Sequence, residues 1–558
     1  MMINFKKAIS LVLVASMALS MAACGAKEPA APAESGAAAP EATSTSMYPG
    51  TPNPKEIVMN LASEPPKLNS LITTDSTSSI VLVHTMDGLT KLDENSNPQP
   101  AIAEKWTQSE DGLTYTFNLR KDAKWSNGEA VTAKDFVFAW TTLLTPATAA
   151  EYAYMGYIFK NGESFYNGKC KIEEVGFKAI DDYTLEVVLQ NPLPYLLGQL
   201  AYKTFLPVNE KAYKEIGGDK YATEAEYFVT NGGYKMESWT HEDNIVLVKN
   251  PDYYNAANVD IEKIKMLMIS DSNTAMNGFK TGDIDMIGLS GDQPAMLKAE
   301  GYPIQGYADG SCWYFEFNTA DKRLNAKIRQ ALTMAVDVES LIKNVLKNES
   351  TVAYSFTPEC ISGADGKPFA QAVGKLVERD AAKAKTLFEE GLKEAGITAK
   401  DLDGITFLTD EGDNAARMTT FVQEQWKKNL GFTCEVQQMP FKSRLDRMSN
   451  KDFGIVLAGW SPDYNDPMTF LDLWVSDGGN NHTGYKNPAY DKLIDDAKTE
   501  IDPMKRQAMF VEAEKIIATD APIGLIYNRV RNFVCSEKLS GVVRTPFIDT
   551  SLMMAKSK

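Results

Sequence analysis

The chain has 558 residues, of which 44% are hydrophobic and 23% are charged, and its formal net charge at pH 7 is −17. That length exceeds one compact domain, and an acidic chain with a pI of about 4.9 is a poor match for nucleic acid or for an anionic lipid surface. The six cysteines show no CxxC spacing and the three histidines lie far apart in sequence. We therefore expect no metal site, no cofactor and no disulfide framework.

Residues 1–23 predict an export signal. Two lysines precede a short apolar run, 8–21, and the small residues Ala22 and Ala23 lead to Cys24. These features are typical of a secretory signal, and a run of about 14 residues is too short to span a bilayer comfortably. A cysteine at this point resembles the lipobox of bacterial lipoproteins. We expect Cys24 to be acylated, with palmitate among its lipids, and the mature chain to be anchored on the extracytoplasmic face of the cell membrane. The alternative is an ordinary secretory signal that contains a cysteine.

Residues 24–49 are predicted to form a flexible tether. The stretch from Gly25 to Thr43 is rich in Ala, Pro, Glu and Ser and has no periodic apolar face. Such a composition cannot bury a core, so the segment should hold a globular body away from the membrane.

Strand patterns are visible at several places in the rest of the chain. Apolar and polar residues alternate in two segments, 113–119 and 183–189, which predicts half-buried strands. Two apolar runs, 245–248 and 453–458, predict more fully buried strands. Strand and helix signals alternate along the chain, so we expect an α/β protein with several sheets.

Helix signals follow toward the C-terminus. The sequence predicts helices at 381–395 and 419–430, each followed by a glycine, and at 503–519, which begins with a proline. A strand-like stretch, 523–534, comes after them. The chain should therefore return to a sheet begun earlier, and its domains need not be contiguous.

The common catalytic motifs are missing. The sequence contains no Walker-type phosphate loop, no GxSxG and no HExxH. Ser340–Lys343 matches SxxK and Lys280–Gly282 matches KTG, two marks of penicillin-recognising serine enzymes. They occur in the reverse order, however, and no SxN motif lies between them. We therefore expect no enzymatic activity and no catalytic residue.

Seven strings resemble the peptide-binding class of solute-binding proteins that serve ATP-driven (ABC) importers, solute-binding protein family 5. The resemblance extends over most of the chain from about residue 54 to 536, and the strings occur in the family's order: DGLTKLDENSNPQPAIAEKW (87–106), DGLTYTFNLRKDAKWSNGEAVTAKDFVFAW (111–140), VTNGGYKMESW (229–239), NPDYYN (250–255), FKTGDIDM (279–286), RQALTMAVD (329–337) and AGWSPDYNDPMTFL (458–471). The last string, with SDGGNN after it, is closer to the oligopeptide branch than to the dipeptide, nickel or haem branches.

The resemblance implies a two-lobed, type II periplasmic-binding-protein-like fold with an extra subdomain. The two lobes would close around the ligand by a hinge motion. By analogy the parts are lobe one (50–88, 210–312 and 529–558), the extra subdomain of lobe one (89–209) and lobe two (313–528).

The resemblance also implies how a peptide would be held. A receptor for many peptides must bind what all of them share, which is the backbone amides and the charged ends. A buried ammonium needs a carboxylate partner, and the family's acidic residue matches Asp463. The alternative for Asp463 is a turn residue, since aspartate favours turns.

The remaining site residues come from the same resemblance. Gly459 and Ser461 would offer backbone groups to the peptide, and Trp460 would form the wall of a side-chain pocket. Further contacts in the cleft are expected from Asn480, Tyr152, Tyr527 and Ser76. Trp460 as a core residue and Tyr527 as ordinary strand packing are the alternatives, and Asp466 and Pro467 should shape the loop.

Two departures from the family limit the analogy. Some oligopeptide binders carry an arginine that meets the carboxylate of a short peptide, and that position here is Leu457. Lys347 is a candidate replacement, with a solvated surface lysine as the alternative. Some relatives link the positions of Cys312 and Ser461 by a disulfide, which a serine cannot form, so Cys312 should be a free, buried thiol.

The sequence thus predicts the extracytoplasmic substrate-binding component of an ABC peptide importer. Its expected partners are short peptides, a permease, an ATPase and, through the lipid anchor, the membrane, and we expect a monomer that does not bind nucleic acid. A peptide-pheromone receptor of the same fold remains open, because both would use the same cleft. An extracellular hydrolase is the third alternative.

Overall fold

The computed structural model describes residues 53–558, so the predicted signal, the predicted tether and Cys24 lie outside the described residues. Within 53–558, none of the helices has the length and apolar character needed to cross a membrane.

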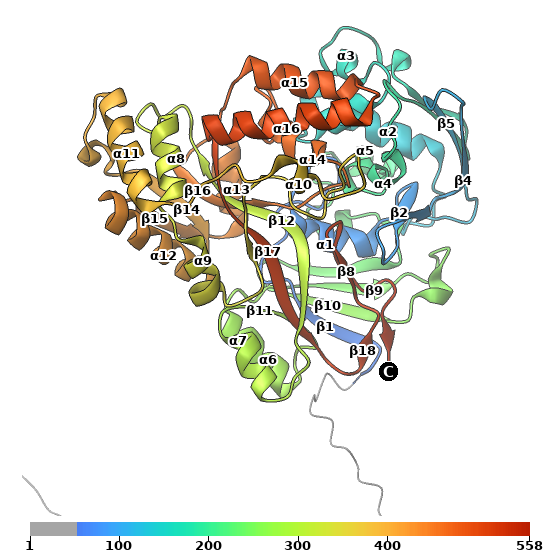
Figure 1. Ribbon diagram of the computed structural model, residues 1–558. Helices are drawn as coiled ribbons and strands as arrows, with labels where there is room; N and C mark the ends of the chain where they lie inside the picture. Colours follow the sequence, from blue (N-terminus) through green and yellow to red (C-terminus); the bar gives the residue numbers. More distant parts are fainter. Residues whose placement is uncertain (1–52) are drawn as a thin grey trace, which may run out of the picture. The chain divides into compact units, whose positions relative to one another are not determined.

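One large mixed sheet forms the centre of the described chain (Figure 1). Strand β13 (Thr351–Val352) pairs with β17 beside the main path of the sheet. The strands of that path, in spatial order, are β15 (Glu435–Met439), β14 (Thr406–Asp410), β16 (Ile455–Trp460), β12 (Gln305–Phe317), β17 (Ile523–Cys535), β11 (Met286–Leu289), β1 (Glu56–Asn60), β10 (Lys263–Leu267), β9 (Asn244–Lys249) and β8 (Tyr234–Thr240).

Two long strands connect the two halves of this sheet. β12 and β17 have 13 residues each and pair antiparallel, and each reaches from the half with β16 to the half with β11. The ladder between them is irregular from Ala308 to Cys312. The lobe boundaries expected from the sequence, 312/313 and 528/529, fall inside these strands, which is a suitable place for a hinge.

Smaller sheets surround the main one. An antiparallel sheet lies within the expected subdomain and consists of β4 (Ala103–Gln108), β5 (Thr114–Leu119), β7 (Thr184–Val188) and β6 (Phe177–Asp181). Three strand pairs complete the β structure: β2 (Thr90–Leu92) with β3 (Pro98–Pro100), β19 (Val543–Thr545) with β20 (Ile548–Ser551), and β18 (Leu539–Ser540) with β21 (Lys556–Ser557).

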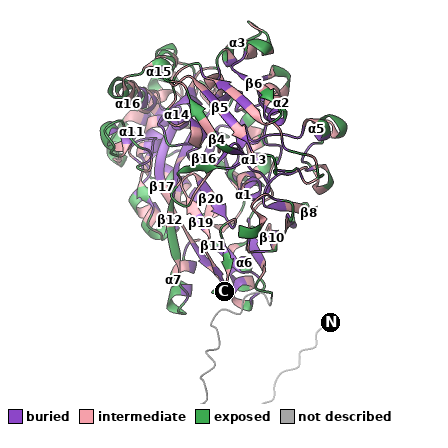
Figure 2. Cartoon of the chain, turned by 90° about the vertical axis from the view of Figure 1, so that its right-hand side faces the viewer, coloured by how far each residue is buried: buried purple, intermediate pink, exposed green. Residues whose placement is uncertain are grey.

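Helices cover the sheets, and buried residues concentrate on the strands and the inward helix faces (Figure 2). The α-helices are α1 (Ser76–Thr85), α2 (Ala133–Leu144), α3 (Gly162–Tyr166), α4 (Leu196–Gln199), α5 (Glu210–Ile216), α6 (Ser272–Thr281), α7 (Gln293–Ala299), α8 (Ala326–Met334), α9 (Val338–Leu341), α10 (Phe369–Val373), α11 (Ala381–Ala395), α12 (Asp413–Leu430), α13 (Phe441–Ser449), α14 (Met468–Leu471), α15 (Pro488–Thr499) and α16 (Pro503–Asp520).

Aromatic side chains organise separate cores. In the expected subdomain the buried Trp140 ring stacks on Phe159, and its indole N–H donates to the carbonyl of Phe205 over 3.1 Å. In the other half of the molecule Trp426 packs against Phe407, and its indole N–H donates to a carbonyl of α8 over 2.7 Å. Each indole thus buries its ring and satisfies its single donor.

The structure confirms the α/β class and most of the predicted elements. The half-buried strand β5 alternates between buried and partly exposed residues, and the C-terminal strand β17 returns to pair with β11 and β12. The helix predicted at 419–430 is longer than expected, because α12 begins at Asp413. Its first turns are mostly polar or small residues, so the apolar periodicity starts only at Met418.

Candidate ligand-binding cleft

The loop after β16 places Asp463 beside the central sheet. The backbone N–H of Asp463 donates to the Thr469 hydroxyl over 2.9 Å, which fixes the loop against the start of α14. Asp466 points elsewhere: it accepts two hydrogen bonds from the Arg506 guanidinium, at 2.5 and 2.9 Å. Asp466 therefore anchors the loop, and the Asp463 carboxylate stays available.

Three side chains from the expected subdomain surround the Asp463 carboxylate. The Tyr152 hydroxyl donates to Asp463 Oδ1 over 3.2 Å and lies 3.3 Å from the hydroxyl of Tyr202. The buried Lys203 ammonium donates to the Tyr202 hydroxyl over 2.7 Å and to Ser79 over 2.8 Å. The carboxylate thus comes from one half of the molecule and its neighbours come from the other half.

Burial controls the protonation of this cluster. Desolvation raises the pKa of Asp463 to about 6, against the opposing effects of the Lys203 charge and of hydrogen bonds from Tyr202 and Tyr152. Burial also lowers the pKa of Lys203, while the carboxylates of Asp463 and Asp75 act in the opposite direction. A further cation at Asp463 would relieve this desolvation penalty.

A cavity of about 410 Å³ opens next to Asp463, and both halves of the molecule line it. Seven of the eight residues predicted for a peptide site lie on its wall: Ser76, Tyr152, Gly459, Trp460, Ser461, Asp463 and Asn480. Tyr527 does not. It lies behind the wall, where its ring stacks on Trp313 at 5.9 Å between centroids, and it is Trp313 that lines the cavity.

The C-terminal end of β16 presents a free edge. β16 pairs with β12 from Ile455 to Trp460, but its pairing with β14 on the other side stops at Val456. Among the described strands, nothing continues the ladder beside Gly459 and Trp460 on that side. An extended chain laid there would gain backbone hydrogen bonds by β-augmentation.

The Trp313 side chain leaves no room for a side chain at position 459. A Cβ at this position would lie 2.9 Å from the indole of Trp313, which passes over the strand. A glycine lets the indole approach the backbone. Trp460 packs edge-to-face on Tyr152 at 6.2 Å, so it belongs to the wall and also braces the tyrosine that donates to Asp463.

The cavity wall carries buried polar atoms without a hydrogen-bond partner in the described chain. They are Nε1 of Trp313, Trp460 and Trp474, Oε2 of Glu316 and Nε2 of His482. Unpaired buried donors and acceptors are rare because each costs free energy. Their concentration on a single wall indicates a surface built to meet a polar ligand.

Several wall residues were not expected from the sequence. Burial raises the pKa of Glu316 to about 8 and lowers that of His482 to about 4, and the Arg444 charge opposes the first shift and reinforces the second. Glu316 lies in a strand, and a charged residue there predicts a solvent-facing side chain. Lys203 stands alone in an apolar stretch, and no local pattern marks it as buried.

The structure also places the residues that depart from the family. Leu457 is buried in the core and does not line the cavity. Lys347 lies on the surface, where it pairs with Asp292, and is not part of the cavity wall either. Cys312 is a free, buried thiol, as predicted. The cations on the wall are Lys203, Arg444, Arg529 and Arg531.

Comparison with solved structures indicates the state of the two lobes. Listeria monocytogenes OppA bound to peptide superposes with a TM-score of 0.85, at 34% identity, over 90% of this chain and 99% of that one. A murein tripeptide-binding protein, MppA, in its unliganded open form reaches only 0.58, at 27% identity, over 90% and 97%. The described chain therefore superposes better on the peptide-bound protein than on the unliganded open one.

The sequence matches lead to the same group of proteins. OppA of Bacillus subtilis, an oligopeptide-binding protein, is 37% identical over 496 residues, which is 87% of this chain and 89% of that protein. Residues 97–482 match the family model described as bacterial extracellular solute-binding proteins, family 5 middle. The chain belongs to the bacterial extracellular solute-binding proteins of family 5.

Proposed function

We propose that this chain is the extracytoplasmic substrate-binding component of an ABC peptide importer and captures short peptides between its lobes. The observation that carries the proposal is the Asp463 carboxylate, which is buried at the wall of a cavity shared by both lobes and is contacted by hydroxyl groups. In the described chain, no lysine or arginine forms an ion pair with it. A peptide ammonium is the cation that fits there.

The free edge of β16 supports a place for the backbone of the same peptide. Its amides would pair with Gly459 in β16 and with Ser461 just after the strand, and its side chains would enter the space between the lobes. Main-chain recognition of this kind is independent of sequence, so the receptor should accept many peptides. Trp460, Asn480 and Ser76 shape the space without selecting one side chain.

The wider assembly follows from the family. The loaded chain would deliver its peptide to a permease driven by an ATPase, and it would act as a monomer without catalysing a reaction. Acylation of Cys24 and the tether, 24–49, would keep it at the membrane. Cys24→Ala should release the chain from the membrane fraction, or block its processing, while peptide affinity stays the same. Membrane retention at the wild-type level would contradict the anchor.

The test of the proposal is the loss of affinity at Asp463. Removing one partner of a buried ion pair costs about 3–5 kcal/mol, so Asp463→Ala should weaken peptide binding roughly 10²–10³-fold or more. Asp463→Asn keeps the shape but loses the charge and should also bind poorly. N-acetylation of a peptide should lower its affinity for the wild type strongly. It should lower the affinity for the two variants only slightly, because they have already lost the ammonium partner. Calorimetric titration measures all three.

Two results would contradict the assignment. A loss below about fivefold in Asp463→Ala would make this residue a loop element, and equal affinity for free and acetylated peptides would exclude ammonium capture. Native mass spectrometry of the undenatured protein should show bound peptides of a few residues. A single defined peptide in every preparation would favour the pheromone receptor over the importer component.

A further inference from the structure

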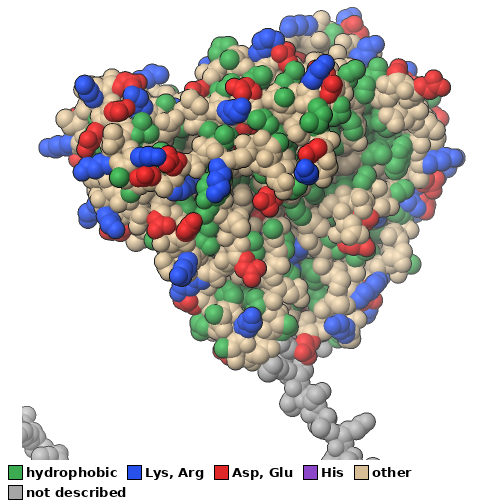
Figure 3. All heavy atoms as spheres, in the orientation of Figure 1, with side chains coloured by type: hydrophobic (Ala, Val, Ile, Leu, Met, Phe, Trp, Pro, Cys, Tyr) green, Lys and Arg blue, Asp and Glu red, His purple; other side chains and the backbone are tan. Residues whose placement is uncertain are grey.

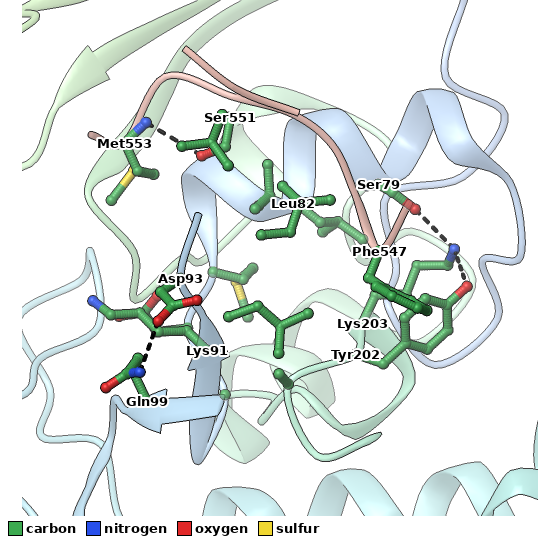
Figure 4. A pocket seen from close by; sticks show the side chains of 18 of the residues that line it. Ser79, Leu82, Lys91, Asp93, Gln99, Tyr202, Lys203, Phe547, Ser551 and Met553 are labelled. Carbon is green, nitrogen blue, oxygen red and sulfur yellow. Dashed lines mark hydrogen bonds between the residues drawn. The ribbon is translucent and has the colours of Figure 1, made fainter. Parts of the chain in front are cut away.

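A second cavity, of about 550 Å³, lies behind the first one, and we call it the rear chamber. Helix α1, strand β2, helix α4 and the C-terminal segment 543–556 enclose it (Figure 4). Most of the exposed surface of its wall is apolar and comes from side chains such as Leu82, Val83, Leu206, Val259, Ile548 and Met553, although charged residues also line it. Hydrophobic side chains also gather on the surface over the region of α4 and β2 (Figure 3).

The rear chamber and the cleft meet at the proposed ammonium site. Asp463, Tyr202, Lys203 and Phe547 line both cavities. In Figure 4 the Lys203 ammonium is held between Ser79 and Tyr202 at one end of the chamber, beside the Phe547 ring. A ligand group bound to Asp463 would therefore stand at the junction of the two spaces.

The two cavities differ in chemistry. The cleft wall carries five buried polar atoms without a partner, whereas no such atom belongs to a residue on the described chamber wall. Among the polar groups of its wall, Gln99 donates to Asp93 over 2.9 Å, and Asp87 accepts hydrogen bonds from Tyr253 and Tyr254 over 2.7 and 2.6 Å. The chamber therefore suits a group that needs burial and no hydrogen bonds.

We infer that the rear chamber receives the apolar side chain of the first residue of the peptide, while the ammonium of that residue is held by Asp463. This inference rests on the proposed function. The first residue is the one whose side chain starts two bonds from the ammonium nitrogen, so its side chain begins at the junction. The peptide backbone leaves in the other direction, along β16. The receptor would then prefer peptides with a large apolar first residue.

A peptide series tests the preference. Tetrapeptides X-Ala-Ala-Ala, with Gly, Leu, Met or Phe as X, are titrated into the full chain, beside the permuted peptides Ala-Ala-Ala-X. Full burial of such a side chain is worth about 10- to 100-fold in affinity. The Leu, Met and Phe members should exceed the Gly member by that factor in the first series, and the second series should show a much smaller spread.

Variants that fill the chamber test whether the preference for an apolar first residue arises there. Gly198 lines the chamber, and a Cβ placed there meets no atom within 4 Å, so Gly198→Phe adds volume without a backbone conflict. Val83→Phe fills it from α1. Both should abolish the advantage of Leu and Phe over Gly as first residue. Gly288→Phe is the matched control, since Gly288 has equally open surroundings and lines neither cavity.

The outcomes separate this inference from the function on which it rests. Failure of every peptide to bind would contradict the proposed function itself. Binding with no preference at the first position, or a preference that survives both filling variants, would contradict only the role of the rear chamber. Decanoate, a free amphiphile, and an N-decanoyl peptide are titrated as competing ligands. If either one binds the wild type more tightly than the Leu-first peptide does, and Gly198→Phe abolishes its binding, the chamber would be assigned to that ligand instead.

Discussion

If the proposed site is correct, the Asp463 carboxyl group should link peptide binding to pH. Its pKa in the empty protein is raised to about 6 because the side chain is buried, and only the ionised form pairs with an ammonium. Below pH 6 binding must first remove a proton, so affinity should fall by about tenfold per pH unit. Above pH 7 this group should no longer change the affinity. Calorimetric titration of one free peptide from pH 4.5 to 8 measures the profile.

The control for this profile is Asp463→Asn, which should give weak binding with little slope near pH 6. The groups that face Asp463 are Tyr152, Tyr202 and Lys203, and burial holds the pKa values of both tyrosines well above 10. Glu316 and His482 also line the cavity, and any slope they produce should survive in the variant. An unchanged slope there would assign the pH effect to titratable groups of the cleft other than Asp463.

Single residues were predictable where a short string resembled the family. Asp463, the proposed ammonium partner, and Gly459 lie in one such string, and the structure brings both to the cavity wall. Lys203 and Glu316 gave no local signal, because their burial depends on contacts with distant parts of the chain. Whether Tyr527 touches a ligand stays a prediction, since Trp313 stands between it and the cavity.

Among the elements, the bulge of β12 imposes a clear conformational requirement. Gly310 has φ +72°, and a Cβ there would lie 2.8 Å from Pro546 and 2.9 Å from the Cys360 sulfur. Left-handed strain alone costs about 1–3 kcal/mol, so Gly310→Ala should lower the free energy of unfolding by more than that amount. Gly366 has φ +76° with open surroundings, so Gly366→Ala isolates the strain. Urea denaturation gives both losses, and equal losses would show that the contacts at Gly310 relax freely.

Elements were predictable where periodicity and caps agreed. Strand β5 alternates and helix α11 lies between Asp380 and Gly396, and both were found within a residue or two of the predicted ends. The order of strands in the main sheet was not accessible from the residues alone, because β1, β11, β12 and β17 come from distant parts of the sequence. Only the predicted strand 523–534, near the C-terminus, indicated that the chain returns to a sheet begun earlier.

At the scale of the whole molecule, we expect closure of the lobes to depend also on contacts outside the proposed binding site. Tyr195 of the expected subdomain stacks on Tyr464 of the expected second lobe, with centroids 5.1 Å apart and planes inclined by 7°. Neither ring lines the cleft or the rear chamber. An aromatic pair of this kind contributes about 0.5–1.5 kcal/mol, so it should favour the closed arrangement by that amount.

Tyr195→Ala should therefore weaken the binding of all peptides by the same factor, about twofold to tenfold, because it lowers the population of the closed state and leaves the site intact. The Tyr195 hydroxyl also accepts a hydrogen bond from Arg506 over 3.3 Å, and Tyr195→Phe removes that bond while keeping the stacking. Tyr195→Phe should bind nearly as the wild type does. Small-angle scattering should show the radius of gyration decreasing on peptide addition in all three proteins, with the empty alanine variant the most open. A loss that depends on peptide sequence would place Tyr195 in the binding site instead of in the closure of the lobes.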